Sequence, residues 1–559
     1  MKLQLDQSLG WSVSAILAVL VLFPLAAVII QILLPGVFFG ELRLGDFRLL
    51  LELFHRPLWL KSLVNSVLLA LGTTLLGTLL GGILATVRSA WRFPTAGMLD
   101  AAVWALLITP SFILAQGWVM FAAPNGFAVR MFGWEWVPSA VFQPAGLIVI
   151  MALSKFPLAY LSVRAAMEWQ VGQLADAARL CGASPFAAWR SIQAPLLLPS
   201  YLAGAALVFM DTVGDFGLPA SIAAVYRFPT LPYSIYTAIY TSPIRFDMAG
   251  VLSFYLVLLI TLAMLLQFYA MRRARFDFLT ARAVPAVPKP AGKFGWVAAV
   301  FNVGFLLVAL GVPLGGNLLM SVLKTQGSGL HPDNFTLHHY ASLFAERSEL
   351  VNGLWRSLAI SASAAVAGLV IGLLVAYVLM YSAFRFKCWI EVLSIVTLAV
   401  PGVVLGIGYI FVWNQKWLEP LGLLLYGKPA ILALAAIAGA IPIIVRIIVG
   451  AMAKVPRSLL DAAQLSGDSF IRRMRRILAP LVRGALVSAA LSAFGAGVFD
   501  LAVNTILFPP GFMTLPVTIN KAFENLKFGY ASAATIFGGG TVVAIILLVE
   551  LMFRRKRKG

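Results

Sequence analysis

Long apolar stretches constrain the fold of this chain more than any other feature of its sequence. Each is about the 20 residues that an α-helix needs to cross a bilayer, and with 61% apolar and only 11% charged residues the composition excludes a soluble domain. We therefore predict an all-α polytopic membrane protein with about 12 transmembrane helices. The twelve stretches lie near residues 11–34, 60–87, 99–121, 144–167, 197–224, 248–270, 296–322, 355–381, 389–413, 429–451, 483–508 and 533–553.

Basic residues indicate how these spans are oriented. Lys and Arg concentrate in segments 272–293, 454–483 and 554–558, which the twelve-span topology places on one side of the membrane. Because positively charged loops stay inside, we expect this side to be cytoplasmic, together with both termini. The formal net charge of +20 then follows the topology, so we expect no nucleic-acid partner. Membrane lipid is the expected partner of the terminal basic cluster.

The chain contains an internal duplication. Six spans precede the repeat point and six follow it, which predicts two parallel six-helix repeats. We place the first half at 1–271, a basic proline-containing cytosolic linker at 272–295 and the second half at 296–559. At an offset of 291, Ser66, Gly77, Gly81, Ala85, Pro110 and Gly117 match Ser357, Gly368, Gly372, Ala376, Pro401 and Gly408. At 285, Pro157, Met167, Val213 and Asp215 match Pro442, Met452, Val498 and Asp500, and at 284 Thr230-Leu231-Pro232 matches Thr514-Leu515-Pro516.

One polar loop recurs in full between the fourth and fifth spans of each half, at 172–195 and 457–480. Asp176, Ala177, Ala178, Gly182, Ile192 and Pro195 recur 285 residues later as Asp461, Ala462, Ala463, Gly467, Ile477 and Pro480. The pattern predicts a short helix, a reversal at the glycine, and a second helix that the proline ends. Arginines make the copies electrostatically unequal: Arg179 and Arg190 flank the first, whereas Arg472, Arg473, Arg475 and Arg476 crowd the second.

This loop resembles the EAA loop of ABC-importer permeases, which reads Glu-Ala-Ala, then Gly, then Ile-x-Leu-Pro. Here Asp replaces the Glu, and Ala194 or Ala479 replaces the Leu. The resemblance implies the ABC type I importer permease fold in a bacterial inner membrane. It also implies that each loop is a coupling helix for one of two copies of a cytosolic ABC ATPase, and that an extracytoplasmic solute-binding protein delivers the solute. ATP and Mg would bind the ATPase, so we expect neither a cofactor nor enzyme activity in this chain.

The solute is suggested by a more limited resemblance. A fused twelve-span permease is most similar to the ferric-iron group, and residues 213–217, Val-Gly-Asp-Phe-Gly, resemble an Asp-Phe-Gly segment of that group. The expected solute is therefore ferric iron. Permeases for thiamine, polyamines or phosphonates share the architecture and are alternatives.

Three carboxylates, Asp211, Asp215 and Asp500, fall in or near spans five and eleven. An unpaired carboxylate is costly in a membrane and should face a cavity or a partner. One hypothesis is that these groups, with Asn504, line the translocation path and attract a cation. The alternative is buried structural pairing or hydrogen bonding at helix ends. Lys155, which Ala440 replaces in the second half, is expected to pair with an aspartate or to extend toward the membrane surface.

Other functional classes find less support. An ion-coupled secondary transporter would use the membrane carboxylates but would not need the doubled loop. His331, His338 and His339 match no zinc-binding spacing, which favours an ordinary external loop. Residues 422–429 superficially resemble a phosphate-binding loop, yet Pro429 stands where Ser or Thr is required after the lysine.

Overall fold

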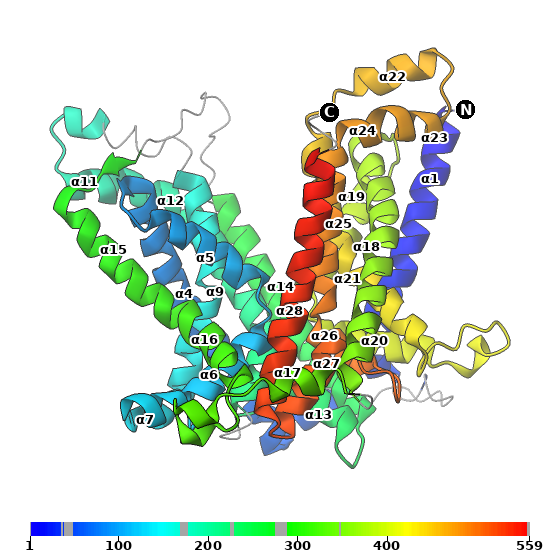
Figure 1. The fold of residues 1–559 in the computed structure, drawn as a ribbon. Coiled ribbons are helices and arrows are strands. Elements are labelled where there is room, and N and C mark those ends of the chain that lie inside the picture. The colour runs from blue at the N-terminus through cyan, green and yellow to red at the C-terminus, as the bar shows by residue number, and fades with distance from the viewer. Residues whose placement is uncertain are drawn as a thin grey trace. The chain divides into compact units, whose positions relative to one another are not determined.

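The computed structural model describes residues 2–34, 37, 48–167, 177–223, 228–273, 288–345 and 348–555, and most of them are helical. These residues form two compact units (Figure 1). Unit 1 comprises residues 1–51, 235–253 and 338–559, and unit 2 comprises residues 52–234 and 254–337. Each unit is described below by itself.

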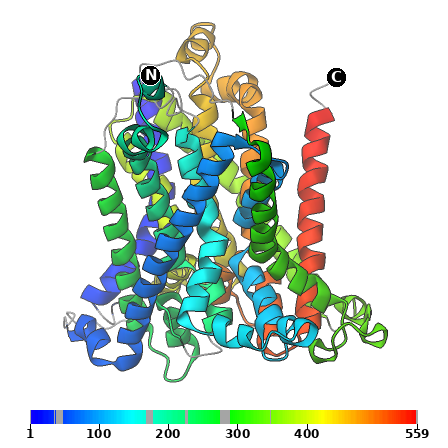
Figure 2. The same cartoon turned by 90° about the vertical axis from the view of Figure 1, so that its left-hand side faces the viewer.

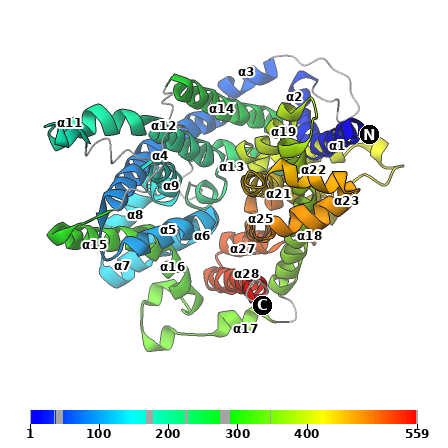
Figure 3. The same ribbon diagram turned by 90° about the horizontal axis from the view of Figure 1, so that it is seen from above.

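Unit 1 is a helical bundle whose long members run side by side. Its elements are α1 (Lys2–Leu17), η1 (Ala18–Leu22), α2 (Phe23–Leu33), α17 (His338–Leu343), α18 (Glu349–Tyr381), α19 (Lys387–Ala399), α20 (Gly402–Trp413), η8 (Lys416–Leu418), α21 (Pro429–Met452), α22 (Arg457–Leu465), α23 (Phe470–Arg473), η9 (Met474–Leu478), α24 (Ala479–Leu481), α25 (Arg483–Val498), α26 (Leu501–Leu507), α27 (Leu515–Glu524) and α28 (Phe528–Arg555). The start of α1, the end of α28 and α22–α24 all lie at one end of this unit (Figures 1 and 3).

Unit 2 has the same plan, and three helices, α3 (Arg48–His55), α13 (Leu231–Tyr240) and α14 (Phe246–Arg273), cross the boundary between the units. Its other elements are α4 (Pro57–Ala90), β1 (Trp91–Arg92), α5 (Ala96–Ile108), α6 (Ser111–Ala122), α7 (Phe127–Phe132), α8 (Trp136–Val141), α9 (Pro144–Met167), α11 (Pro185–Ala188), η3 (Trp189–Gln193), α12 (Ala194–Gly214), η4 (Pro219–Ala223), β2 (Lys289–Pro290), α15 (Gly292–Leu306), η5 (Leu307–Gly311), α16 (Val312–Ser321), η6 (Gln326–Ser328) and η7 (Pro332–Asn334).

Each unit contains the first helix of the opposite sequence half. In unit 1 the carbonyl oxygen of Pro24, in α2, lies 2.2 Å from where a Cβ on Gly408 would be. In unit 2 the carbonyl oxygen of Pro313, in α16, lies 1.8 Å from the equivalent point on Gly117, and α16 packs beside α6 (Figure 2). The two sequence repeats therefore do not coincide with the two compact units. The first helix of each repeat packs in the unit that contains most of the other repeat.

Small residues let the central helices of each unit approach closely, as their repeated positions indicate. A Cβ on Gly81 of α4 would lie 2.5 Å from the carbonyl oxygen of Phe156 in α9. A Cβ on Gly372 of α18 would lie 2.5 Å from Cγ2 of Ile444 in α21. Space rather than backbone conformation therefore favours glycine at both positions, more strictly at Gly81, where the close atom belongs to the backbone.

The described residues contain ten helices long and apolar enough to span a membrane, or eleven if the bent pair Phe470–Leu481 and Arg483–Val498 is one span. The predicted stretches 99–121 and 389–413 are each broken at a matching proline. Thr109 and Val400 are extended, with ψ of 121° and 122°, because the ring of the following Pro110 or Pro401 disfavours the helical conformation. The chain is a multi-pass membrane protein.

Candidate functional site: the paired loop elements

In both copies of the doubled loop, the first helix ends in the same way, at a glycine with positive φ. Gly182 has a φ of +92° and Gly467 a φ of +86°, a region that glycine enters without steric cost. The N–H of Gly182 donates to Arg179 O at 3.0 Å, and that of Ala183 donates to Ala178 O at 3.0 Å. This is the Schellman arrangement, and it confirms the predicted reversal.

The second copy repeats these bonds. Gly467 N–H donates to Gln464 O at 3.1 Å, and Asp468 N–H donates to Ala463 O at 3.0 Å. We call residues 177–195 and 461–480 the two loop elements. Asp176, the first residue of the motif, lies outside the described residues, whereas its counterpart Asp461 lies 3.6 Å from Arg457.

A serine begins the helix that follows each reversal. Ser184 Oγ accepts a hydrogen bond from Ala187 N–H at 3.2 Å, and Ser469 Oγ accepts one from Arg472 N–H at 3.4 Å. Both are N-cap interactions, which satisfy a donor that the helix itself leaves unpaired. Ser184 and Ser469 are also 285 residues apart, so helix end, glycine and helix start form one repeated unit.

Large apolar side chains are exposed at matching positions of the two elements. Leu180 and Leu465 are each 90% exposed, and Phe186 and Ile471 are 65% and 74% exposed. Ala177 and Ala462 are exposed as well. Each element thus presents two large apolar side chains next to a small-residue surface.

The prediction that the proline ends the second helix is wrong for Pro195, whereas the helix in the second element ends at Leu481, one residue after Pro480. The helix from Phe186 continues through η3 and α12 to Gly214, and the helix in the second element continues to Leu481 before an 83° bend into α25. Each proline follows a π-helical turn, in which Ala194 N–H bonds Trp189 O, or Ala479 N–H bonds Met474 O. The wider turn leaves room for a ring that would clash with the carbonyl four residues earlier in an α-helix.

The second element is anchored in the core of unit 1. Leu460, Met474 and Leu478 are buried in one cluster with residues of α18, α21 and α25, among them Tyr381. The Tyr381 hydroxyl donates to the carbonyl oxygens of Met452 and Val455 at 2.9 and 3.0 Å. Contiguous packing therefore joins α22 to the helices of the bundle.

Arginine exposure is smaller in the second element than its sequence indicates. Arg473 is only 6% exposed, and its guanidinium donates to Gln464 Oε1 at 3.0 Å. Arg472, Arg475 and Arg476 are exposed. In the first element Arg179 and Arg190 are exposed, so an inequality of charge between the elements persists.

The carboxylates of α12 form an ion-paired group in unit 2. Lys155 Nζ lies 2.6 Å from Asp211 Oδ2 and 2.7 Å from Asp215 Oδ2. The Asp215 side chain is 3% exposed, that of Asp211 50%. Asp215 Oδ1 also accepts hydrogen bonds from Ser111 Oγ and Leu218 N–H. Pairing of Lys155 with aspartate is confirmed.

The second half retains only part of this group. Asp500 N-caps α26, accepting a hydrogen bond from Val503 N–H at 3.1 Å, and its backbone oxygen accepts one from Asn504 Nδ2. Ala440 and Ala496 stand where the first half has Lys155 and Asp211. Asn504 is 7% exposed, and its Oδ1 has no hydrogen-bond partner in the described part of the chain.

The remaining candidate residues are not assembled into a site. His338 and His339 lie at the start of α17, and no group of three or more potential metal-binding His, Cys, Asp or Glu residues occurs among those that the structure describes. Gly422 and Gly427 occupy turns with positive φ before α21.

Comparison with known proteins identifies the type of protein that carries these elements. Residues 368–558, which include the whole second loop element, match the family of binding-protein-dependent transport system inner membrane components. The ferric transport system permease protein FbpB of Actinobacillus pleuropneumoniae is 21% identical over 99% of this chain and 79% of its own length. This chain belongs to the ABC-importer permeases.

Other relatives of the permease differ in the solute that their names specify. A protein of Sinorhizobium fredii, y4fN, is named as an ABC transporter permease and is 24% identical over 89% of this chain and 88% of its own length. PhnV of Salmonella paratyphi A, named as a 2-aminoethylphosphonate transport permease, is 27% identical over 48% of this chain and 96% of its own length.

Sequence reasoning did not identify two features of the permease's loop elements. The capping serines, Ser184 and Ser469, and the exposed leucines, Leu180 and Leu465, both recur at the offset of 285. That offset is the signal that locates them, but leucine exposure cannot be read from a sequence in which leucine is abundant.

Proposed function

We propose that the two loop elements are the docking sites of two copies of a separate cytosolic ATPase, which drives import of solute delivered by an extracytoplasmic binding protein. One observation carries this proposal most directly: Leu180 and Leu465 are both 90% exposed at equivalent positions of two identically folded elements. In this arrangement ATP and Mg bind the ATPase, and both loop elements and both termini face the cytoplasm.

Burial of these side chains accounts for the docking energy. Removing a leucine side chain from water contributes about 1.5–3 kcal/mol, and Phe186 and Ile471 add a second anchor to each element. The adjacent alanines allow a partner's surface to approach closely.

The packing of the second loop element against unit 1 allows a docked ATPase to move the membrane helices. Because Met474 and Leu478 of the second element, and Leu460 just before it, are packed into the core of unit 1, a displacement of α22 moves the helices behind it. Work is transmitted only if the ATPase binds one conformation of the permease more tightly than the other. The ATPase's nucleotide-dependent closure supplies that difference.

We also propose that the two docking sites differ in strength. Arg472, Arg475 and Arg476 give the second element three exposed cations, and cations beside an interface add binding energy only where the partner is acidic. Two identical ATPase copies therefore experience different electrostatic environments. Association at the second element should be the more sensitive to salt.

The proposed solute is ferric iron, and the proposed path residues are Asp211, Asp215, Asp500 and Asn504. The ferric-transport relative aligned along almost the whole chain supports the solute, and carboxylate oxygens suit a hard cation. Asp211 is the most exposed of the three carboxylates near the predicted spans. The PhnV relative makes a phosphonate the second candidate.

Docking is tested by co-purifying the permease with the ABC ATPase encoded nearest to its gene. Leu180→Asp with Leu465→Asp should abolish retention of the ATPase, while each single change should leave partial retention. Leu421→Asp is the matched control, because Leu421 is 65% exposed but lies outside both elements. Full retention by the folded double variant would refute docking at these elements.

The solute is tested separately, in cells that lack their own copy of this permease. Uptake of radioactive ferric iron and of 2-aminoethylphosphonate is compared with and without the permease. Iron uptake that disappears in the Asp211→Asn and Asp500→Asn variants supports both solute and path. Uptake of 2-aminoethylphosphonate without uptake of iron would identify a phosphonate as the solute and would not affect the docking proposal.

A further inference from the structure

A short parallel ribbon in unit 2 brings together two segments about 200 residues apart. Trp91 pairs with Lys289 and Arg92 with Pro290 in β1 and β2, and Ala291 N–H donates to Arg92 O at 3.4 Å. The ribbon joins the end of α4 to the start of α15. We call residues 91–92, 289–290, 293–294 and 296 the ribbon surface.

The ribbon surface combines cations with exposed aromatic rings. Arg92, Lys289 and Lys293 are exposed. Trp91, Phe294 and Trp296 are 36%, 48% and 69% exposed, and the Trp91 and Phe294 ring centroids lie 5.2 Å apart. No acidic residue occurs in either segment, 88–93 or 288–296. The surface is thus both strongly basic and amphipathic.

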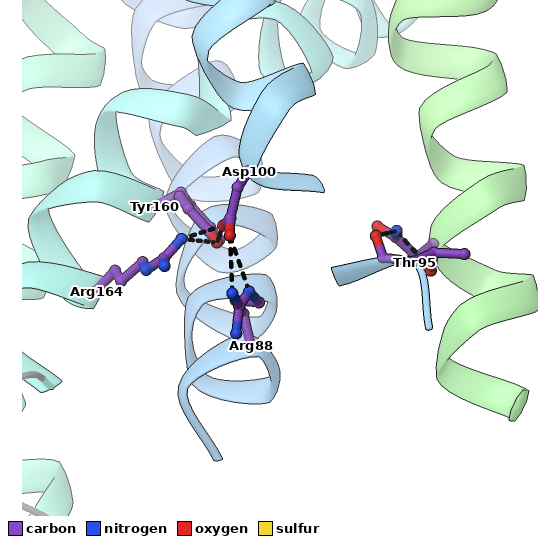
Figure 4. Close-up of polar contacts among 6 residues, drawn as sticks. Arg88, Thr95, Asp100, Tyr160 and Arg164 are labelled. Atoms are coloured by element: carbon purple, nitrogen blue, oxygen red, sulfur yellow. Dashed lines mark hydrogen bonds and ion pairs between the residues drawn. The ribbon is translucent and has the colours of Figure 1, made fainter. Parts of the chain in front are cut away.

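Polar contacts behind the ribbon surface hold its supporting helices in place. Asp100 of α5 accepts hydrogen bonds from Arg88 at 2.9 and 3.1 Å, from Tyr160 at 2.8 Å and from Arg164 (Figure 4). The one carboxylate is therefore engaged by two guanidinium groups and leaves a net positive charge. It offers no compensation for the cations of the ribbon surface.

A second contact fixes α15 to the same turn. Asn302 Nδ2 donates to the backbone oxygen and to Oγ1 of Thr95, both at 3.0 Å, and Thr95 lies just before α5 (Figure 4). The three segments that surround the ribbon surface are thus linked by buried or partly buried polar contacts. The backbone that carries the surface is thus held in place by these contacts.

The position of the ribbon surface matches the headgroup level of a membrane. It lies at the ends of two candidate spans, Pro57–Ala90 and Gly292–Ser321. Tryptophan is enriched where spans meet the headgroups, and clustered Lys and Arg on the cytoplasmic side attract anionic lipids. A soluble partner would need an acidic, partly apolar face held at membrane level, whereas an anionic lipid supplies both the charge and the apolar chains at that level.

We propose that the ribbon surface binds the headgroup of an anionic phospholipid, with the phosphate among Arg92, Lys289 and Lys293 and the acyl chains beside Phe294 and Trp296. This site is separate from the loop elements and does not depend on the transported solute.

Unit 1 contains a weaker counterpart of the ribbon surface. Trp11, 285 residues before Trp296, is 58% exposed and packs on Phe384 and Phe386, next to the exposed Arg385. In unit 1 the segment between α18 and α19 contacts an acidic side chain, because Asp6 accepts a hydrogen bond from Ala383 N–H at 2.9 Å. The aromatic element is thus repeated, while the cluster of three cations occurs at the ribbon surface.

The test is titration of the full-length permease, in a neutral detergent, with phosphatidylglycerol and with phosphatidylcholine, followed by native mass spectrometry. Each cation contributes about fivefold to affinity for an anionic lipid. Arg92→Gln with Lys289→Gln and Lys293→Gln should therefore weaken phosphatidylglycerol binding at the tightest site at least tenfold. The matched control neutralises three exposed lysines elsewhere, Lys324, Lys416 and Lys428, and should leave that site unchanged.

Hydrogen exchange then locates the lipid. Phosphatidylglycerol should slow exchange in peptides covering 88–95 and 288–297 of the wild-type permease, but not in the triple variant. Equal losses in the triple variant and the lysine control would overturn the proposal. So would equal protection by glycerol 3-phosphate, which would indicate a soluble anion site, or by phosphatidylcholine, which would indicate apolar contact alone.

Discussion

The Ser66 hydroxyl accepts a hydrogen bond from the backbone N–H of Leu231 at 2.8 Å, and the same bond recurs in unit 1 between Ser357 and Leu515 at 2.9 Å. Ser66 and Ser357 are 2% and 3% exposed. The bond satisfies the first N–H of α13 or α27, which has no partner within its own helix. Two repeated sequence motifs, a serine and a Thr-Leu-Pro, thus meet in space.

The first prediction concerns this contact. Ser66→Ala and Ser357→Ala should each destabilise the permease by about 1–3 kcal/mol, because a buried N–H loses its acceptor. Thermal unfolding in detergent measures the change. Ser363→Ala is the control, since Ser363 is exposed and its hydroxyl donates to Ile360 O of its own helix, so its loss should change the midpoint little. A shift no larger than the control's would contradict the assigned role.

The second prediction concerns the reversals of the loop elements. Gly182→Ala and Gly467→Ala should each cost about 1–2 kcal/mol of loop stability, because an L-residue resists positive φ. A Cβ would meet nothing within 4 Å at either position, so the cost is conformational. ATPase retention should fall after either change and recover partly with asparagine. Gly484→Ala, in α25 and equally unobstructed, should leave retention unchanged; equal loss there would argue against a role of backbone geometry.

A third prediction concerns the ion-paired group. Lys155→Ala leaves Asp211 and Asp215 without their cation and should destabilise unit 2 by about 3–5 kcal/mol. Lys155→Ala combined with Asp211→Ala reproduces the alanine pair of the second half and should recover part of the loss. Yield and unfolding midpoint in detergent measure both effects. If the double variant is no more stable than Lys155→Ala, the two residues do not act as a pair.

A fourth prediction tests the exchanged first helices. Gly408→Ala would place a Cβ 2.2 Å from Pro24 O, so α2 must shift and unit 1 should lose about 1–3 kcal/mol or more. Gly439→Ala, in α21 with nothing within 4 Å, should be neutral or stabilising. Unfolding midpoints of the two variants provide the comparison. Equal midpoints would mean that α2 does not pack on Gly408.

Local chemistry explains which features the sequence predicts. The reversals at Gly182 and Gly467 follow from residue type and spacing, and the approach of α4 to α9 follows from Gly81. The breaks at Pro110 and Pro401 are not predicted by the apolar stretches, because the hydropathy of a segment does not show where its helix is interrupted. The continuous helix through Pro195 depends on a π-turn that no residue type specifies.

Long-range pairing is the part that sequence reasoning could not reach. The exchange of first helices depends on which surface Pro24 and Pro313 meet, and apolar helices of similar composition offer many such surfaces. Likewise, a lysine within a predicted span indicates a carboxylate partner, but only the packing of α9 against α12 selects both Asp211 and Asp215 for Lys155.

The proposal that an ATPase docked at the two loop elements drives import is tested most directly by solute uptake into proteoliposomes. These contain the permease and its ATPase, with the binding protein and its solute outside and ATP enclosed. We predict uptake that requires ATP and is abolished by Leu180→Asp with Leu465→Asp. Uptake by the permease alone, driven by an imposed proton or ion gradient and unaffected by that double change, would contradict it and favour a secondary transporter.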